Sequence, residues 1–170
     1  VETVDGKFVA ADARIIIDDN ALFRHPEYKR RLLEGESELT SQEIEAMKND
    51  LAYVKLEGDI GVIGNGAGLV MATLDTIRYY GGKPTNFLDV GGGAPAEETA
   101  TALSIVLSDP NVKTLFINIL GGITRCDEVA RGILEAKAKV GVTKPMVTRL
   151  VGTNEEEGKR MLTEAGIPVL

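Results

Sequence analysis

The sequence predicts an α/β protein built on a doubly wound parallel sheet of about five strands, with helices on both faces. Two observations predict this fold. From about Leu51 onward, short apolar runs alternate strictly with amphipathic stretches of helical length. The apolar runs are continuous, as is typical of parallel strands that are buried on both faces.

Four strand–helix units follow one another in this region, and Val169 begins a fifth strand. Helical periodicity supports each helix; in the first one Leu69, Thr73 and Ile77 fall on one face. The predicted elements are, in chain order, a strand at Ile60–Gly64, a helix to Tyr80, a strand at Asn86–Val90, a helix from Pro95 to the stop signal Ser108-Asp109-Pro110, a strand at Thr114–Leu120, a helix that Gly141 ends, a strand at Pro145–Val151 and a helix at Thr153–Ala165.

The size of this region suits a flavodoxin-like sheet better than a full dinucleotide-binding fold. We expect its crossover connections to be right-handed. We therefore assign residues 51–170 to one flavodoxin-like domain.

Residues 1–50 are polar and irregular, and we interpret them as the β-rich tail of a preceding domain because they are too few to own a core. The expected elements are two short antiparallel strands at Phe8–Ala11 and Ile15–Ile17, a turn at Asp18–Asn20, a helix from Pro26 through Leu33, and a helix to about Lys48 opened by a capping box at Thr40–Glu43.

Composition excludes several classes of protein. The net charge is −7 and the pI about 4.8, which argues against nucleic-acid binding. No apolar run has the length of a membrane span. One Cys and one His exclude a disulfide framework and a Cys/His metal site, and an unpaired Cys fits a reducing compartment. We expect the cytoplasm, or the mitochondrial matrix in a eukaryote.

Both ends of the sequence predict a piece of a longer polypeptide. The chain lacks an initiator Met, and its first residues do not have the pattern of a signal peptide. At the other end, Ile167–Leu170 reads as a strand that has only begun.

Three predicted strands end in glycine-rich loops, at Gly64–Gly68, Gly91–Gly93 and Gly121–Thr124. In parallel α/β sheets the ligand crevice lies beyond the carboxyl ends of the strands. The helix after each loop presents free N–H groups and a partial positive charge, which suit an anion. One such loop is weak evidence, but three at one edge favour a binding site. We expect Gly122 to be its sensitive residue, because a Cβ there would block close approach and forbid a positive φ.

The remaining motifs are weaker evidence of function. Gly64–Gly68 does not match the dinucleotide fingerprint G-x-G-x-x-G, and Asp89, which could imitate its ribose-binding acid, lies within a strand. The sole imidazole, His25, fits a solvated surface residue better than a catalytic one, and Cys126 fits a packing residue better than a nucleophile. Asp12 suits a metal carboxylate and an ordinary turn equally well.

Arg125 and Asp127 follow the third glycine loop. Both suit a solvated surface, although Arg125 beside an anion is a candidate for charge neutralisation. Thr124 has a hydroxyl that could cap the following helix.

Long strings of the sequence resemble the β subunit of succinyl-CoA synthetase (succinate–CoA ligase), and the resemblance runs from end to end in order and spacing. The strings are Asp18-Asp19-Asn20-Ala21-Leu22-Phe23-Arg24, Asn65-Gly66-Ala67-Gly68-Leu69, Asn86-Phe87-Leu88-Asp89-Val90-Gly91-Gly92-Gly93 and Asn118-Ile119-Leu120-Gly121-Gly122-Ile123-Thr124-Arg125-Cys126-Asp127.

The resemblance implies an ATP-grasp domain, of which residues 1–50 are the C-terminal remnant, followed by the flavodoxin-like CoA-ligase domain. It implies a reaction of the tricarboxylic acid cycle in which NTP, succinate and CoA give succinyl-CoA, NDP and phosphate. The phosphohistidine intermediate belongs to the α subunit, so no catalytic residue is expected in this chain, which alone is inactive. Mg²⁺ and ATP or GTP are implied as cofactors, with CoA held mainly by the α subunit of an αβ or (αβ)₂ heteromer.

The resemblance also implies roles for particular residues. Asp12 matches a Mg²⁺-binding aspartate and Asn65 a substrate-binding asparagine. Gly122, Ile123 and Thr124 match a segment that binds substrate together with the α subunit, and Gly121 precedes it in the same phosphate-binding loop. Position 124 is commonly Val in this family, so Thr124 departs from the pattern.

Two other readings stay open. The chain could serve a related acid–CoA ligase, such as malate–CoA ligase or ATP-citrate lyase, which share the glycine loops. It could also act, when isolated, as a non-catalytic module for subunit docking.

Overall fold

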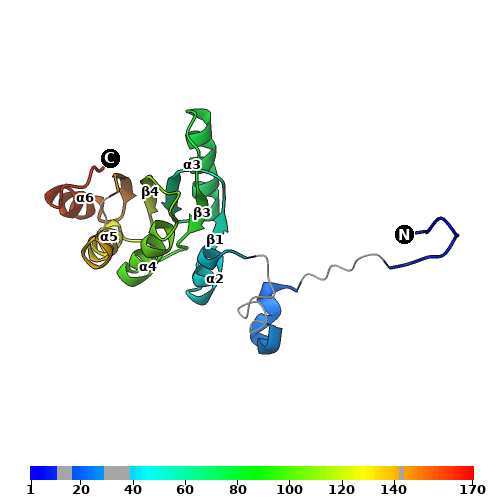
Figure 1. The fold of residues 1–170 in the computed structure, drawn as a ribbon. Coiled ribbons are helices and arrows are strands. Elements are labelled where there is room, and N and C mark those ends of the chain that lie inside the picture. Colours follow the sequence, from blue (N-terminus) through cyan, green and yellow to red (C-terminus); the bar gives the residue numbers. More distant parts are fainter. Residues whose placement is uncertain (11–16, 29–38, 142–143) are drawn as a thin grey trace. The chain divides into compact units, whose positions relative to one another are not determined.

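A computed structural model describes residues 1–10, 17–28, 39–141 and 144–170 (Figure 1). The chain divides into two compact units, Val1–Glu38 and Leu39–Leu170. Among the described helices, none combines the length and the apolar character that crossing a membrane requires.

The first unit contains the short 3₁₀ helix η1 (Asp19–Arg24), where the sequence predicted a turn at Asp18–Asn20. Residues 26–28 are helical, in agreement with the predicted helix start, and the rest of that helix lies outside the described residues. Phe8 forms an isolated antiparallel bridge with Glu2. The predicted partner strand at 15–17 and the candidate metal ligand Asp12 fall largely or wholly outside the described residues.

The second unit is built on a five-stranded sheet with the order β1-β3-β2-β4-β5. Its strands are β1 (Ala52–Lys55), β2 (Ile60–Gly64), β3 (Asn86–Asp89), β4 (Thr114–Gly121) and β5 (Met146–Gly152). Strands β3, β2, β4 and β5 are parallel. A parallel bridge from Thr148 to Val169 extends the order at the far edge. The parallel set therefore has the flavodoxin-like order, and the predicted fold class is confirmed.

The sheet differs from the prediction in being mixed. Strand β1, which the sequence analysis missed, pairs antiparallel with β3, from Ala52 opposite Asp89 to Lys55 opposite Asn86. Its four residues alternate between exposed and half-buried, a pattern too short to recognise as a strand. The ammonium group of Lys55 forms an ion pair with Asp109, a buried residue in the segment that precedes β4. This contact helps to hold β1 against the sheet.

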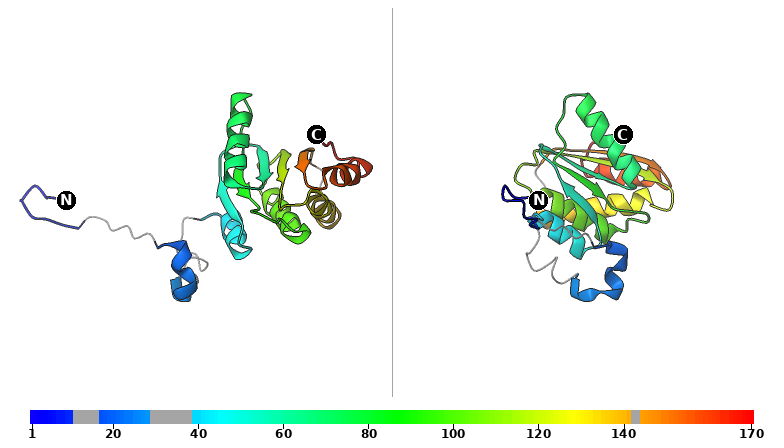
Figure 2. Two further views of the ribbon diagram at one scale, coloured as in Figure 1. Left: turned by 180° about the vertical axis from the view of Figure 1, so that it is seen from behind. Right: turned by 90° about the vertical axis from the view of Figure 1, so that its right-hand side faces the viewer.

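Helices cover both faces of the sheet, as predicted (Figures 1 and 2). On one face α4 packs against α5, and α5 packs against α6. Helix α2 packs against α4 and β1 on the same side. Helix α3 lies on the opposite face, over β2 and β3. The bounds are α2 Ser41–Lys48, α3 Ala67–Tyr79, α4 Ala96–Leu107, α5 Cys126–Val140 and α6 Glu155–Glu164.

Two apolar clusters follow from this arrangement. The larger one fills the space between the sheet and the four-helix layer and includes Leu103, Ile117 and Ile133. The smaller one lies under α3 and is formed by Val62, Val70 and Leu74. With a core on each face, the sheet is fixed in place and its carboxyl edge becomes a rigid platform for loops.

Helix α2 begins with the capping box that the sequence predicted. The Thr40 hydroxyl accepts the N–H of Glu43 at 3.3 Å, and the Glu43 carboxylate accepts the N–H of Thr40 at 2.8 Å. Helix α5 ends at Gly141, whose φ of 65° is the left-handed conformation that glycine adopts readily. Both predicted boundaries are confirmed.

Candidate functional site

The three glycine loops meet at the carboxyl edge of the sheet. Strand β2 lies between β3 and β4, and its last residue, Gly64, is in register with Asp89 and with Asn118. Because all three strands run in the same direction, the loops that follow them emerge side by side. The structure thus brings Asn65 and the loop Gly121–Thr124 together, as the sequence predicted from the strand pattern.

The side chain of Asn65 connects the first of these loops to the end of β4. Its Nδ2 donates to the carbonyl of Leu120 at 2.9 Å, and its Oδ1 accepts the N–H of Leu120 at 2.8 Å. The same Nδ2 also donates to the hydroxyl of Thr124 at 3.2 Å. Both amide hydrogens therefore have acceptors within the protein, so donation from this amide to a substrate requires one of these bonds to be exchanged.

Thr124 occupies the centre of the loop cluster. Only 2% of its surface is exposed. Its hydroxyl accepts the N–H of Gly93 at 3.1 Å as well as the amide of Asn65. The expectation that this hydroxyl caps helix α5 is wrong, because Arg125 is the N-cap residue of that helix and makes no capping bond. Thr124 instead ties all three loops to one another.

The two glycines of the third loop differ in what surrounds them. A Cβ on Gly121 would lie 2.9 Å from the nitrogen of Thr153 and 3.1 Å from the carbonyl oxygen of Thr124. A Cβ on Gly122 would meet no atom within 4 Å. Gly122 is also not among the glycines with positive φ, so the expectation that it needs this conformation is wrong. Any requirement for glycine at Gly122 must come from what binds there.

The exposed part of this loop offers hydrogen-bond donors. Within the described part of the chain, the N–H groups of Gly122, Ile123 and Thr124 donate to no protein acceptor. Ile123 is 88% exposed and presents its apolar side chain beside them. Consecutive N–H groups without internal acceptors suit a phosphate or carboxylate group.

The N-terminus of helix α5 carries its own negative charge. Asp127 is buried and receives the guanidinium of Arg125 through two bonds, of 3.2 and 2.8 Å. This ion pair lowers the pKa of Asp127 from its ordinary 3.8 to about 2, with help from the amide of Asn154. The N–H of Cys126 donates to Thr153. The first turn of α5 is therefore less suited to an anion than the loop before it, and Asp127 is not the solvated residue that the sequence analysis favoured.

Helix α3 begins differently, with no acidic residue in its first turn and no side-chain cap. The N–H groups of Ala67 and Gly68 find no acceptor among residues 39–141 and 144–170. This second group of donors lies at the same edge of the sheet, because α3 follows β2 directly.

Asp89 is the site residue that the sequence analysis did not identify as one. One of its carboxylate oxygens accepts the N–H of Gly66 at 2.6 Å and the N–H of Gly91 at 2.7 Å. It joins the first two glycine loops and does not resemble a ribose-binding acid in its contacts. The available signal was its position at a strand end between two glycine motifs.

Neither His25 nor Cys126 lies in an environment that would activate it as a nucleophile. The side chain of His25 is 51% exposed and lies 3.3 Å from Glu27. Cys126 is fully buried, and this burial raises the pKa of its thiol. A buried, protonated thiol is a poor nucleophile, and its surroundings agree with the packing role expected for it.

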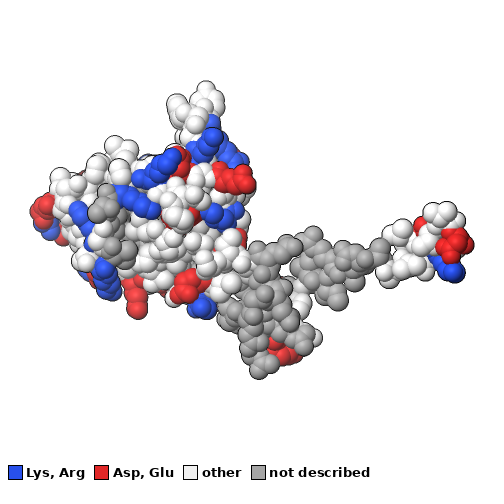
Figure 3. Space-filling model, in the orientation of Figure 1, with Lys and Arg blue, Asp and Glu red and all other residues white. Residues whose placement is uncertain are grey.

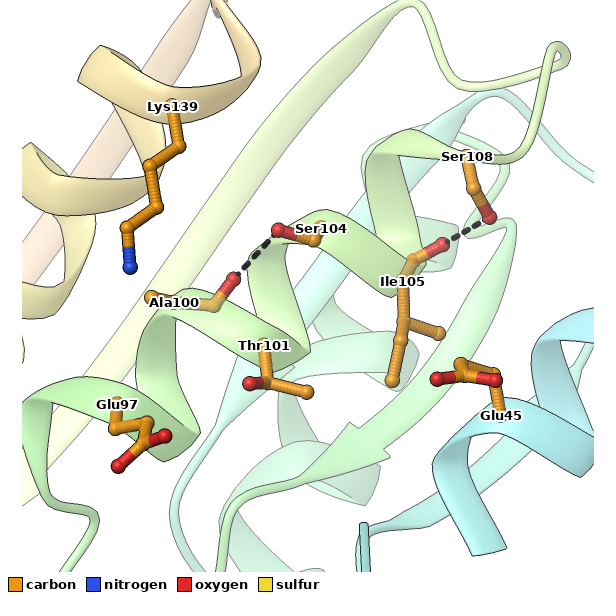
Figure 4. A pocket seen from close by; sticks show the side chains of 8 residues that line it. All are labelled: Glu45, Glu97, Ala100, Thr101, Ser104, Ile105, Ser108 and Lys139. Carbon is orange, nitrogen blue, oxygen red and sulfur yellow. Dashed lines mark hydrogen bonds between the residues drawn. The ribbon is translucent and has the colours of Figure 1, made fainter. Parts of the chain in front are cut away.

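The second unit also has a groove of about 330 Å³ away from the glycine loops, between α2, α4 and α5 (Figure 4). Glu45, Glu97 and Lys139 border it, and Ser104 and Ser108 turn their hydroxyls back to helix carbonyls. On the face drawn in Figure 3, Lys and Arg are interspersed with Asp and Glu over this unit. Among the described residues there is no group of three His, Cys, Asp or Glu side chains that would hold a metal ion.

The fold and the site define a flavodoxin-like α/β domain with backbone N–H donors gathered at the carboxyl edge of its sheet, where such sheets have their ligand crevice. The chain belongs to the CoA-ligase family, whose sequence profile matches residues 63–170.

Named relatives support this assignment. The chain is 56% identical over 98% of its length to the β subunit of the ADP-forming succinate–CoA ligase of Desulfurococcus amylolyticus. It is 58% identical over 95% of its length to the β subunit of the GDP-forming enzyme of Thermus thermophilus. It spans only 43% and 42% of the lengths of these two relatives.

Solved structures share the fold. An ATP citrate lyase of Methanosaeta concilii, in complex with (3S)-citryl-CoA, superposes with a TM-score of 0.68 at 19% identity, over 90% of this chain and 45% of that one. An acetyl-coenzyme A synthetase of Candidatus Korarchaeum cryptofilum superposes with a TM-score of 0.58 at 19% identity, over 85% of this chain and 38% of that one.

Proposed function

We propose that this chain is the C-terminal part of the β subunit of a succinate–CoA ligase, an acid–thiol ligase. In the proposed reaction NTP, succinate and CoA give succinyl-CoA, NDP and phosphate, through a phosphohistidine on the α subunit. The observation that carries the proposal is the loop Gly121–Thr124, whose N–H groups at Gly122, Ile123 and Thr124 have no acceptor among the described residues. The identity to β subunits over nearly the whole chain supports it.

The loop would stabilise negative charge on a phosphoryl group or a carboxylate. Backbone N–H groups held in place before the ligand arrives need no reorganisation, which makes them effective donors to a developing anion. Gly122 has no side chain, and no protein atom lies within 4 Å of the position that a Cβ would take. A ligand can therefore approach the backbone of Gly122 closely. Ile123 offers an exposed apolar contact to the α subunit, the proposed partner.

The resemblance to succinate–CoA ligase β subunits implies that the phosphorylated histidine belongs to the α subunit, and the histidine and the cysteine of this chain agree with that assignment. His25 is an exposed residue beside Glu27, and Cys126 is buried. The isolated chain should therefore show no ligase activity. Incubated with labelled NTP and Mg²⁺ it should stay unlabelled, and stable label on His25 would contradict the assignment.

Residues 1–50 are proposed as the remnant of an ATP-grasp domain and residues 51–170 as the CoA-ligase domain. Mg²⁺ would be held by Asp12 together with a residue outside this chain, and ATP or GTP mainly by the rest of the ATP-grasp domain. CoA would be held mainly by the α subunit, in an αβ or (αβ)₂ heteromer of the cytoplasm or, in a eukaryote, the mitochondrial matrix.

The decisive experiment is a turnover assay of the full-length β subunit purified with its α subunit. Succinate, malate and citrate are offered in turn with CoA and with ATP or GTP. We expect CoA-ester formation with succinate, at a kcat/KM well above that for the other two acids. A preference for malate or citrate would instead place the protein among the related acid–CoA ligases.

A further inference from the structure

Asp89, the last residue of β3, holds two glycines with a single carboxylate oxygen. The N–H groups of Gly66 and Gly91 donate to this oxygen at 2.6 and 2.7 Å. The φ angles of the two glycines are 97° and 71°. Distances this short are typical of charge-assisted hydrogen bonds. Asp89 thus fixes two backbone conformations that residues other than glycine rarely adopt.

The same loops are joined a second time through Thr124. The amide of Asn65 and the N–H of Gly93 both donate to its hydroxyl, at 3.2 and 3.1 Å. Asn65 is the neighbour of Gly66, and Gly93 lies in the loop that Asp89 holds at its start. The bonds made by Asp89 and those made by Thr124 therefore close a ring through all three glycine loops.

We propose that Asp89 is a positioning residue for the anion-binding loop Gly121–Thr124. It acts through Gly66 and Asn65, whose side chain holds both backbone groups of Leu120 next to that loop. This inference rests on the proposed function, because the anion is the one bound in the proposed reaction. Asp89 is assigned no contact with a ligand.

A purely structural role for Asp89 makes different predictions. If its two bonds only stabilise their own glycines, removing them leaves the bond between Gly93 and Thr124 intact. If they close a ring, removing them loosens that bond as well, because loop 91–93 is no longer held at its start. Protection of the Gly93 N–H from hydrogen exchange therefore distinguishes the two roles without an assay of activity.

The first experiment measures amide hydrogen exchange by NMR on the 170-residue chain. Asp89→Ala should lose protection at Gly66 and Gly91, and also at Gly93, by about ten-fold or more in exchange rate. Asp89→Asn keeps an acceptor oxygen and should retain most of the protection. Unchanged exchange at Gly93 in Asp89→Ala would overturn the ring.

The second experiment measures kcat and KM in the complex of the full-length β subunit with the α subunit. Asp89→Ala should lower kcat by about ten-fold, on the order of one lost charge-assisted hydrogen bond, and Asp89→Asn should restore most of it. Thr124→Val opens the same ring, so the double variant with Asp89→Ala should be little worse than either single variant. If the double variant instead loses kcat by the product of the two single losses, the two residues act independently and the proposal is contradicted.

Asp109→Asn is the matched control. Asp109 is a carboxylate of the same unit, buried where Asp89 is half-buried, and it pairs with Lys55 ahead of β4, away from the glycine loops. Asp109→Asn should lower the melting temperature. It should change the exchange rate of the Gly93 N–H no more than the loss of global stability explains. Its effect on kcat should multiply with that of Thr124→Val in the double variant. A wild-type complex without succinate-dependent turnover counts against the proposed function; an active complex in which Asp89→Ala keeps its full kcat counts against the positioning role alone.

Discussion

The hydroxyl of Thr124 accepts the backbone N–H of Gly93 at 3.1 Å, which joins two loops that lie 31 residues apart in the sequence. Because Thr124 is 2% exposed, water does not compete freely for this bond. The amide of Asn65 shares the same acceptor. One buried hydroxyl thus sets the relative positions of the loops that follow three neighbouring strands.

Thr124→Val keeps the shape of the side chain and removes the acceptor. The N–H of Gly93 and one N–H of Asn65 lose their acceptor, so we expect the free energy of unfolding to fall by about 1–3 kcal/mol. Urea denaturation of the 170-residue chain measures it. Thr124→Ser retains the hydroxyl and should restore exchange protection at Gly93. Equal exchange at Gly93 in wild type and Thr124→Val would show that the hydroxyl is dispensable.

Gly122 and Gly121 should respond to substitution in opposite ways. Gly122→Val should leave the melting temperature close to that of the wild type, because a Cβ there meets no atom within 4 Å. In the full complex it should lower turnover by roughly 10²-fold, on the order of losing one oxyanion donor. Gly121→Ala should lower the melting temperature, because its Cβ would lie 2.9 Å from Thr153 N. Both quantities are measured on one preparation, and an unchanged rate per folded Gly122→Val site would refute the anion-binding loop.

Asn65→Asp tests whether the amide group, rather than the size of the side chain, connects the first loop to β4. The replacement places a carboxylate oxygen where Nδ2 now donates to the carbonyl of Leu120 at 2.9 Å. We expect a loss of about 1–3 kcal/mol at pH 7, and a smaller loss at acidic pH, where a protonated carboxyl can donate again. Chemical denaturation at two pH values measures it. A variant as stable as the wild type at pH 7 would exclude this role of the amide.

The ion pair of Arg125 and Asp127 predicts how stability depends on pH. Its hydrogen bonds lower the pKa of Asp127 from 3.8 to about 2 in the folded protein. A lowered folded-state pKa stabilises the fold above the unfolded-state pKa, and this contribution is lost as the pH falls from about 4 to about 2. Asp127→Asn should remove this component of the acid dependence. Denaturation curves at pH 5, 4 and 3 for both proteins check it, and parallel pH profiles would contradict the assignment.

The order of strands and helices from Ile60 to Val169 could be predicted from the sequence alone, because continuous apolar runs and helical periodicity reflect burial directly. The capping box at Thr40 and the helix end at Gly141 were predictable for a related reason, since both depend on residues adjacent in the sequence. The clustering of the glycine loops also followed, because the carboxyl ends of parallel neighbours share an edge.

Other features depended on contacts between distant segments. Strand β1 joins the sheet because Lys55 and Tyr53 meet partners far along the chain, and its four residues carry too little pattern of their own. The roles of Asp89 and Thr124 were hidden for the same reason. Their partners are backbone N–H groups, which every residue other than proline carries, so no sequence pattern marks the ones they bind.

The sequence by itself therefore determined the fold class, the CoA-ligase resemblance and the edge of the sheet at which we propose that ligands bind. Tertiary structure alone decided which donors remain open at that edge. The N–H of Cys126 is used by Thr153 and the amide of Asn65 by Leu120, whereas Gly122 keeps its N–H free of acceptors within the described residues. The physical reason is that a hydrogen bond depends on distance and direction in space, and folding brings together groups that the sequence keeps far apart.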